Sequence, residues 1–229
     1  MIAIVDYGMG NLRSVQKAFE RVGALARVTA SPADLKEARG IVLPGVGAFG
    51  QAMENLNSGG WVGPLRDACA RKVPLIGICL GMQLLFESSE EMGQHEGLGI
   101  LPGSVRRFKG DLKVPQMGWN QVHIRRSSRL LHGVADGSYA FFVHSYYCEP
   151  SDPSIVLATT DYGIEFASIV EQDQVFGAQF HPEKSQSVGL QMLANFSSLA
   201  NDNFSGDWFA ERPRGAFAAR ACRSRNGIQ

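Results

Sequence analysis

The sequence predicts an α/β fold in which a mixed, mostly parallel central sheet carries helices on both faces. In the first half, short apolar runs alternate with segments whose apolar residues recur at helical spacing. Such alternation is typical of a parallel sheet covered by helices. In the second half, strand-like runs follow one another, and the runs 165–170 and 175–180 are close enough in sequence to form a hairpin.

The expected elements follow from these patterns in chain order. The first strand covers residues 1–5, and the helix after it begins at Asn11, a favourable N-cap residue, and stops at Gly23. Ser31 and Pro32 open a second helix, with proline at a position where its missing N–H is tolerated. The remaining strands are expected at 26–29, 40–43, 74–78, 121–124, 139–147, 155–159, 165–170 and 175–180, and the remaining helices at 64–72 and 185–199.

Length and composition suggest one domain, residues 1–200, followed by a C-terminal tail, residues 201–229. The tail has five arginines against three acidic residues, and Gly, Pro and Arg interrupt any apolar periodicity. We therefore predict that it is mobile, with a functional arm as the less favoured alternative.

Charge, apolar runs and the distribution of cysteine and histidine argue against several function classes. Lys+Arg and Asp+Glu both total 22, and a chain without net charge is not typical of a general nucleic-acid binder. There is no long apolar run for a membrane span and no basic leader of a signal peptide. The four cysteines and five histidines are scattered, so neither a disulfide framework, a metal site nor a cofactor is expected. A cytoplasmic location fits this cysteine usage.

The strongest local signal is the sequence GICLG at residues 77–81. An apolar strand ends at Cys79 and an amphipathic segment begins at once, which predicts a strand-to-helix elbow that exposes a nucleophile. Gly77 and Gly81 provide the room that such a turn needs. The helix N-terminus favours a thiolate, and the Leu80 N–H would point at the oxygen of a carbonyl under attack. The alternative interpretation is a small buried cysteine.

A thiolate nucleophile needs a proton partner, and residues 181–183 (HPE) supply one with an orienting acid. Because His181 and Glu183 are two positions apart, an extended chain would project both side chains to the same face. Glu183 would then accept from one imidazole nitrogen and leave the other for Cys79. The alternative is a surface turn. Of the other histidines, His144 lies in an aromatic strand, whereas the surroundings of His95, His123 and His132 predict exposure.

The glycine-rich loop at residues 44–50 (PGVGAFG) follows a strand but has neither the Walker pattern nor the spacing of a dinucleotide fingerprint. Backbone N–H groups near Val46 and Gly47 are instead candidates for a second oxyanion donor beside Leu80. One such donor is worth about 2.7–4 kcal/mol in acyl transfer.

Together these three motifs resemble the class I, or triad, glutamine amidotransferases. Residues 6–12, 44–49, 115–120 and 181–185 further resemble the glutaminase subunits of imidazole glycerol phosphate synthase. The resemblance runs in order over about residues 1–200. It implies the class I glutamine amidotransferase (flavodoxin-like) fold, and hydrolysis of glutamine to glutamate and ammonia through a cysteine thioester.

The resemblance also implies substrate-binding residues. Gln83 and Glu91 would recognise glutamine near Cys79, with Glu91 opposite the α-ammonium group. The pocket would be closed by the backbone around His144, Ser145 and Tyr146.

A protein partner is implied as well. In such enzymes ammonia passes to a separate (β/α)8-barrel cyclase, which makes imidazole glycerol phosphate and AICAR in histidine biosynthesis. Asn11, Trp119 and Lys184 match positions that face this cyclase. Because the glycine-rich loop can reorient cheaply, we expect low activity without the partner.

Three other functions remain open on the sequence. One is a glutaminase that serves another acceptor, such as pyridoxal phosphate synthesis, although residues 6–12 and 115–120 argue against it. Another is a catalytically silent scaffold, which the presence of Cys79, His181 and Glu183 disfavours. The last is a general cysteine or serine hydrolase, which Gln83 and Glu91 disfavour.

Overall fold

The computed structural model describes residues 1–110 and 112–202. Five strands form the parallel part of its sheet, in the order β2 (Ala26–Thr29), β1 (Ile2–Val5), β3 (Gly40–Gly45), β4 (Leu75–Cys79) and β13 (Val175–Ala178). Their near-continuous apolar sequences suit strands that are buried on both faces.

The second half of the chain extends this sheet with mainly antiparallel strands. β12 (Glu165–Gln172) pairs with β13 as the predicted hairpin, and β10 (Tyr146–Pro150) and β7 (Gly103–Arg107) follow antiparallel. The short strands β5 (Ser88–Ser89) and β6 (His95–Glu96) complete that edge, with β5 parallel to β7. A branch off β12 carries β11 (Val156–Asp161), β8 (Gln116–Ile124) and β9 (Ser138–His144). The predicted mixed sheet is confirmed.

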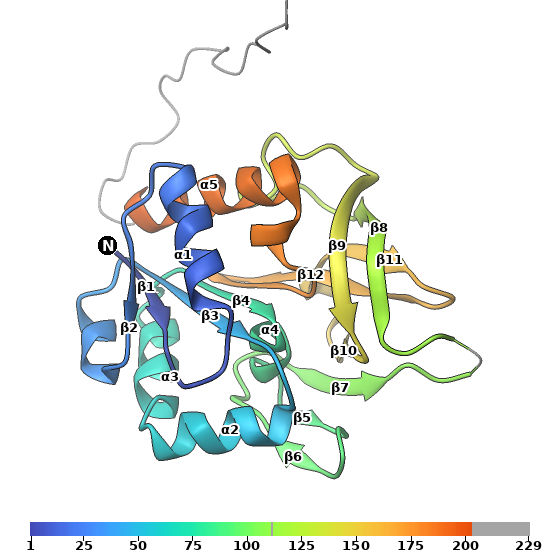
Figure 1. Cartoon of the computed structure of the whole chain (residues 1–229), viewed down its shortest axis with the longest axis horizontal. Coiled ribbons are helices and arrows are strands. Elements are labelled where there is room, and N and C mark those ends of the chain that lie inside the picture. The colour runs from blue at the N-terminus through green and yellow to red at the C-terminus, as the bar shows by residue number, and fades with distance from the viewer. Residues whose placement is uncertain (111, 203–229) are drawn as a thin grey trace, which may run out of the picture.

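Helices cover both faces, as predicted (Figure 1). α1 (Leu12–Arg21) and α5 (Gln186–Asp202) pack on one face, and α2 (Phe49–Ser58) and α3 (Val62–Ala70) on the other, with the 3-10 helix η1 (Pro32–Lys36). Strand β1 shows how the sequence divides between the layers. Ile2 and Ile4 belong to the core under α1 and α5, whereas Ala3 and Val5 belong to the core over α2 and α3.

Several local predictions were wrong. Helix α2 was not expected, because the three glycines at 45, 47 and 50 suggested a loop, whereas the helix begins at Phe49 and includes Gly50. The expected helix at Ser31 is a short 3-10 turn, and the Asn11 side chain makes no capping hydrogen bond. The strand predicted at 139–147 is interrupted at Ser145, which separates β9 from β10. The short strands β5, β6 and β7 were missed because they lack a clear apolar alternation.

The C-terminal helix α5 runs to Asp202, two residues past the predicted domain boundary. The predicted mobile tail covers residues 201–229, of which the first two belong to α5. The rest of that prediction, on residues 203–229, lies outside the described residues. Within residues 1–110 and 112–202, no helix is both long and apolar enough to cross a membrane.

Two pairings in the sheet decide where the site forms. β3 and β4 pair with Gly45 opposite Cys79, so the glycine-rich loop leaves the sheet beside the elbow. β13 pairs with the other side of β4, with Ala178 opposite Ile78. The segment after β13 therefore also leaves the sheet next to Cys79. Carboxyl ends of neighbouring parallel strands are the usual place for a site in α/β sheets.

Candidate active site

Cys79 ends strand β4 and begins the short helix α4 (Leu80–Leu84) in a sharp turn. Its φ of 54° and ψ of −110° lie in a region that side-chain-bearing residues rarely adopt. A strained backbone of this kind costs about 1–3 kcal/mol and clusters at functional sites. The observed outlier is therefore the strand-to-helix elbow expected from the sequence.

Neighbouring glycines make this elbow possible. A Cβ on Gly77 would lie 2.5 Å from the Gly81 carbonyl oxygen, and a Cβ on Gly81 would lie 1.8 Å from the Leu43 carbonyl oxygen. Both distances are too short for a side chain, and the atoms in the way belong to the backbone. Glycine is thus required on both sides of Cys79.

The candidate base and its orienting acid are in contact. Nδ1 of His181 lies 2.8 Å from Oε1 of Glu183, and the side chains are 2% and 1% exposed. The chain between them is not extended as we expected, because Glu183 belongs to the 3-10 helix η3 (Pro182–Lys184). His181 itself is extended, and the turn starting at Pro182 brings the carboxylate back to the imidazole.

The protonation of His181 reflects two opposing effects. Burial disfavours the imidazolium, but interactions with Cys79 and Glu183 outweigh burial and raise the pKa of His181 to about 9. Cys79 is near enough to stabilise the imidazolium but is not aligned for a formed hydrogen bond, since Nε2 of His181 has no partner at normal distance and angle. His181 is thus suited to hold a proton beside Cys79.

His144 has the opposite character. Its Nδ1 lies 2.7 Å from the Tyr146 carbonyl oxygen, which can only accept, so Nδ1 carries the proton. Burial and, to a smaller extent, the charge of His181 outweigh this hydrogen bond and lower the pKa of His144 to about 4. His144 is therefore neutral near pH 7 and does not compete with His181 as a proton donor.

The glycine-rich loop is anchored at both ends. The Tyr7 hydroxyl donates to the Pro44 carbonyl oxygen at 2.9 Å, and a Cβ on Gly45 would lie 2.6 Å from that hydroxyl. Gly47 has a φ of 100°, in the region that favours glycine. At the far end, the Phe49 N–H donates to Oε2 of Glu91 at 2.7 Å. No role was predicted for Tyr7, which follows β1 in the segment 6–12 and carried no separate signal.

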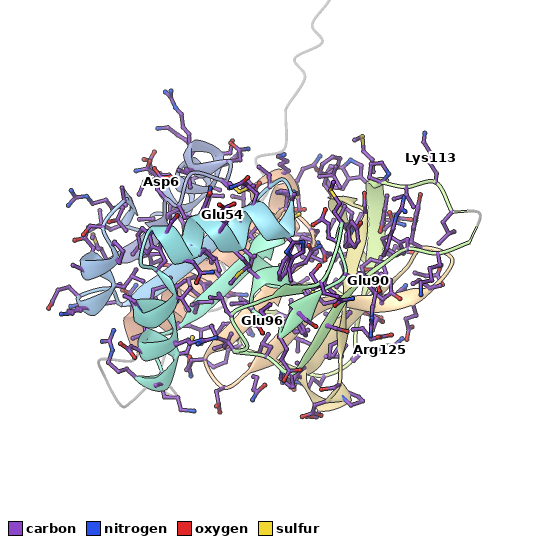
Figure 2. The ribbon with its side chains drawn as sticks, turned by 90° about the horizontal axis from the view of Figure 1, so that it is seen from below. Asp6, Glu54, Glu90, Glu96, Lys113 and Arg125 are labelled. Atoms are coloured by element: carbon purple, nitrogen blue, oxygen red, sulfur yellow. The ribbon has the colours of Figure 1, made fainter. Side chains whose placement is uncertain are left out.

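Glu91 therefore reaches the site from a separate element. It follows β5, in the hairpin that β5 and β6 form. Strand β6 of this hairpin contacts helix α2, and Figure 2 labels Glu96 of β6 and Glu54 of α2. The neighbouring Glu90 contacts Arg106 of β7 instead. His95 of this hairpin is half-buried with its ring 6.5 Å from that of Phe49, so the predicted exposure of His95 is wrong.

One cavity of about 320 Å³, within the size range of small-molecule sites, joins these groups. All predicted oxyanion and glutamine-binding residues line it, together with Cys79 and His181, whereas Glu183 lies behind His181. The lining residues are Val46, Gly47, Cys79, Leu80, Gln83, Glu91, Pro115, Val143, His144, Ser145, Tyr146, His181 and Lys184. Among the described residues, no cluster of His, Cys, Asp or Glu could hold a metal ion.

Of the three predicted interface residues, Lys184 lines the cavity, whereas Asn11 and Trp119 lie outside its lining. Trp119 on β8 is 43% exposed and contacts Phe141 on β9, with ring centres 5.9 Å apart. The Lys184 ammonium lies 6.0 Å from the centre of the same Phe141 ring. An aromatic surface thus extends to the mouth of the cavity through Lys184.

The fold and the site together define a class of protein. The family model for class-I glutamine amidotransferases matches residues 3–199, and the chain belongs to this family. The solved structure of a glutamine amidotransferase superimposes with a TM-score of 0.70 at 20% identity, covering 88% of this chain and 100% of that one. The glutaminase domain of CTPS from Trypanosoma brucei gives a TM-score of 0.65 at 19% identity, covering 88% and 93%.

More similar sequences come from one enzyme. The chain is 54% identical over 206 residues to imidazole glycerol phosphate synthase subunit HisH of Syntrophotalea carbinolica, with 87% of this chain and 100% of that protein covered. It is 51% identical over 203 residues to the same subunit of Desulfitobacterium hafniense, with 89% and 96% covered.

Proposed function

We propose that this chain is the glutaminase subunit of an imidazole glycerol phosphate synthase. It hydrolyses glutamine to glutamate and ammonia, and the ammonia is used by a separate (β/α)8-barrel cyclase in histidine biosynthesis. The observation that carries the proposal is that Cys79 and His181 line one cavity together with Gln83 and Glu91, while Glu183 holds His181 from behind. The similarity to subunits of that name supports the choice of acceptor.

The chemistry follows from the geometry. The thiolate of Cys79 attacks the side-chain amide carbon of glutamine, and the negative charge moves to the amide oxygen. Backbone N–H groups of Leu80 and of Val46 or Gly47 stabilise that oxyanion. His181, held by Glu183, donates its proton to the leaving ammonia and leaves a thioester. Water activated by His181 then attacks the thioester, and glutamate is released.

Recognition of glutamine rests on the other lining residues. Glu91 supplies a carboxylate for the α-ammonium group, and the Phe49 N–H that it accepts keeps that carboxylate in place. Gln83 is 4% exposed and its amide nitrogen already donates to Tyr146 and Gln179. Its carbonyl oxygen is therefore the atom available to glutamine. The segment His144, Ser145 and Tyr146 forms the opposite wall.

The cyclase would dock on the surface that carries Trp119. On the β8–β9 ribbon, Met117 pairs with Val143, and two positions along Trp119 pairs with Phe141. The two pairs share one face, and Met117 is 68% exposed, so this face is apolar and accessible. Lys184 connects this face to the cavity. Asn11 is the third residue that we propose for the cyclase interface. Docking there would let ammonia leave toward the partner, and we propose that it also raises a low basal activity by orienting the Val46–Gly47 peptide.

The free thiols of Cys69, Cys79 and Cys148 agree with a reducing compartment, and we place the protein in the cytoplasm. No cofactor enters the proposed reaction.

The test compares the wild-type chain with Cys79→Ala, each with and without the cyclase and its nucleotide ligand, by measuring glutamate release. Loss of at least a thousandfold in Cys79→Ala is expected, because removing the nucleophile of such a unit costs about 10⁶-fold. Glutaminase activity that an imidazole glycerol phosphate cyclase does not change would point to another acceptor. If the wild-type chain hydrolyses no glutamine, either alone or with the cyclase, the proposal is contradicted.

A further inference from the structure

Gln179 is a buried polar side chain beside the candidate nucleophile. It is 0% exposed and follows strand β13, two positions before His181. Its amide oxygen accepts from Nε2 of Gln83 at 3.1 Å, and its own Nε2 lies 3.9 Å from Sγ of Cys79. A buried amide with both ends engaged is costly to disturb, because each unsatisfied group loses its hydration without compensation.

The direction of each hydrogen bond is determined by the neighbouring backbone. The Tyr146 carbonyl oxygen can only accept, and it takes Nδ1–H of His144 at 2.7 Å and Nε2–H of Gln83 at 2.9 Å. The amide nitrogen of Gln83 therefore points toward Tyr146 and Gln179. Since Gln83 donates, Gln179 must present its oxygen to Gln83 and its NH2 group to Cys79.

Sγ of Cys79 has a second neighbour with the opposite preference. The Val143 carbonyl oxygen lies 3.9 Å away and accepts from the protonated thiol. A carbonyl oxygen cannot donate to a thiolate, whereas the Gln179 NH2 group can. Loss of the thiol proton thus exchanges the contact with Val143 for the contact with Gln179.

We propose that Gln179 is a further catalytic residue, which donates a hydrogen bond to the Cys79 thiolate, with Gln83 and Tyr146 as the positioning residues that aim its amide. Its importance for turnover rests on the proposed glutaminase function, whereas its effect on the thiolate does not. Gln83 then has two roles, because its amide nitrogen orients Gln179 and its amide oxygen faces the cavity.

Other ionisable groups act on Cys79 and remain in place when Gln179 is changed. Tyr7, Cys148 of β10 and His181 interact with it electrostatically. Glu91, His144 and Lys184 line the same cavity, and Glu183 lies behind His181. An isosteric change at Gln179 therefore isolates one neutral hydrogen-bond donor from these charges.

The experiment measures alkylation of Cys79 by iodoacetamide from pH 5 to pH 10 in wild type, Gln179→Met and Gln179→Asn. In this reaction the thiolate sulfur forms a bond to the methylene carbon, and iodide leaves with the electron pair of the C–I bond. Cys79→Ala supplies the background from the other thiols, mass spectrometry locates the modified residue, and Gln191→Met on α5 is the matched glutamine control.

We expect Gln179→Met to slow alkylation about 10-fold near neutral pH, because a hydrogen bond to a charged group is lost. The rates should converge at high pH, where the thiolate forms without this help. Gln179→Asn, which is one methylene too short to reach both neighbours, should act in the same direction, and Gln83→Met should do so more weakly. Thermal melting identifies any variant that fails to fold.

An unchanged pH–rate profile in folded Gln179→Met or Gln179→Asn would overturn the proposal, as would an equal loss of rate at every pH. Failure of the proposed function looks different. Wild type would then release no glutamate, whatever the alkylation profiles of the Gln179 variants.

Discussion

Nδ1 of His181 lies 2.8 Å from Oε1 of Glu183, and almost no solvent reaches either side chain. The second carboxylate oxygen, Oε2, is buried without a hydrogen-bond partner. The charge of Glu183 is therefore directed almost entirely at the imidazole. This relationship leads to the first of four predictions.

Replacing Glu183 with glutamine should reduce glutamine turnover by about 10²- to 10⁴-fold, because an amide neither stabilises the imidazolium nor enforces its tautomer. The affinity for glutamine should change little, since Glu183 does not line the cavity. Steady-state kinetics of glutamate release with the cyclase present measure both. Glu20→Gln on α1, where Glu20 pairs with Lys17 in solvent, is the control. A kcat within threefold of wild type would argue against an orienting role for Glu183.

The raised pKa of His181 should depend on Cys79. Burial alone would hold the pKa below its ordinary value of 6.5, and interactions with Cys79 and Glu183 raise it to about 9. Cys79→Ala removes the Cys79 contribution and keeps the burial, so the pKa of His181 should fall. Titration of the imidazole by NMR in the two proteins measures the change.

His144 is an internal reference for that titration. With a pKa of about 4, its resonances should stay constant from pH 6 to pH 9 in both proteins. An unchanged His181 midpoint in Cys79→Ala would show that the thiol does not interact with this imidazole.

Substitution of Gly81 should distort the elbow. The Cβ of Gly81→Ala would lie 1.8 Å from the Leu43 carbonyl oxygen, and backbone on both sides must shift. We expect a loss of roughly 3 kcal/mol in the free energy of unfolding, measured by urea denaturation, together with loss of glutaminase activity. Gly63→Ala is the matched control, because Gly63 lies in α3 with no atom within 4 Å of a new Cβ. There alanine should be neutral or stabilising by up to about 1 kcal/mol.

Trp119 should contribute to cyclase binding without affecting the fold. An exposed tryptophan that packs on Phe141 is suited to become buried against a partner, and such anchors often cost about 2 kcal/mol, or roughly 30-fold in Kd, when truncated. Isothermal titration of Trp119→Ala with the cyclase measures this loss.

Leu25→Ala provides the comparison for Trp119. Leu25 is 76% exposed but lies beside Met1 and Ile2, at the amino end of the parallel strands and away from the cavity. Equal effects of the two substitutions would mean that the cyclase does not use the Trp119 surface.

Local sequence was enough to predict the alternation of strands and helices, because buried parallel strands and amphipathic helices have distinct apolar periods. It was also enough to predict the elbow, since GICLG follows an apolar strand and the two glycines leave room for the turn. It failed for α2, where Gly45, Gly47 and Gly50 suggested a longer loop. The first of them ends β3 and the last lies inside the helix.

Gln179 shows a different kind of failure. In the predicted strand 175–180, which is otherwise apolar, a single glutamine two positions before His181 could have been placed on the same side of the chain. Its role was missed because both of its partners, Gln83 and Cys79, are about a hundred residues away in sequence.

The sequence by itself determined the α/β class, the residue types needed for acyl transfer and their attachment to strand ends. Only the tertiary structure decided that β13 pairs with β4, with Ala178 opposite Ile78, which puts His181 next to Cys79. Pairing between strands distant in sequence depends on how the whole sheet buries its two faces, and no local pattern encodes it. The turn at Pro182 then decided that Glu183 meets His181 through a 3-10 helix, because contacts of η3 with α5 and β9 select that conformation over an extended chain.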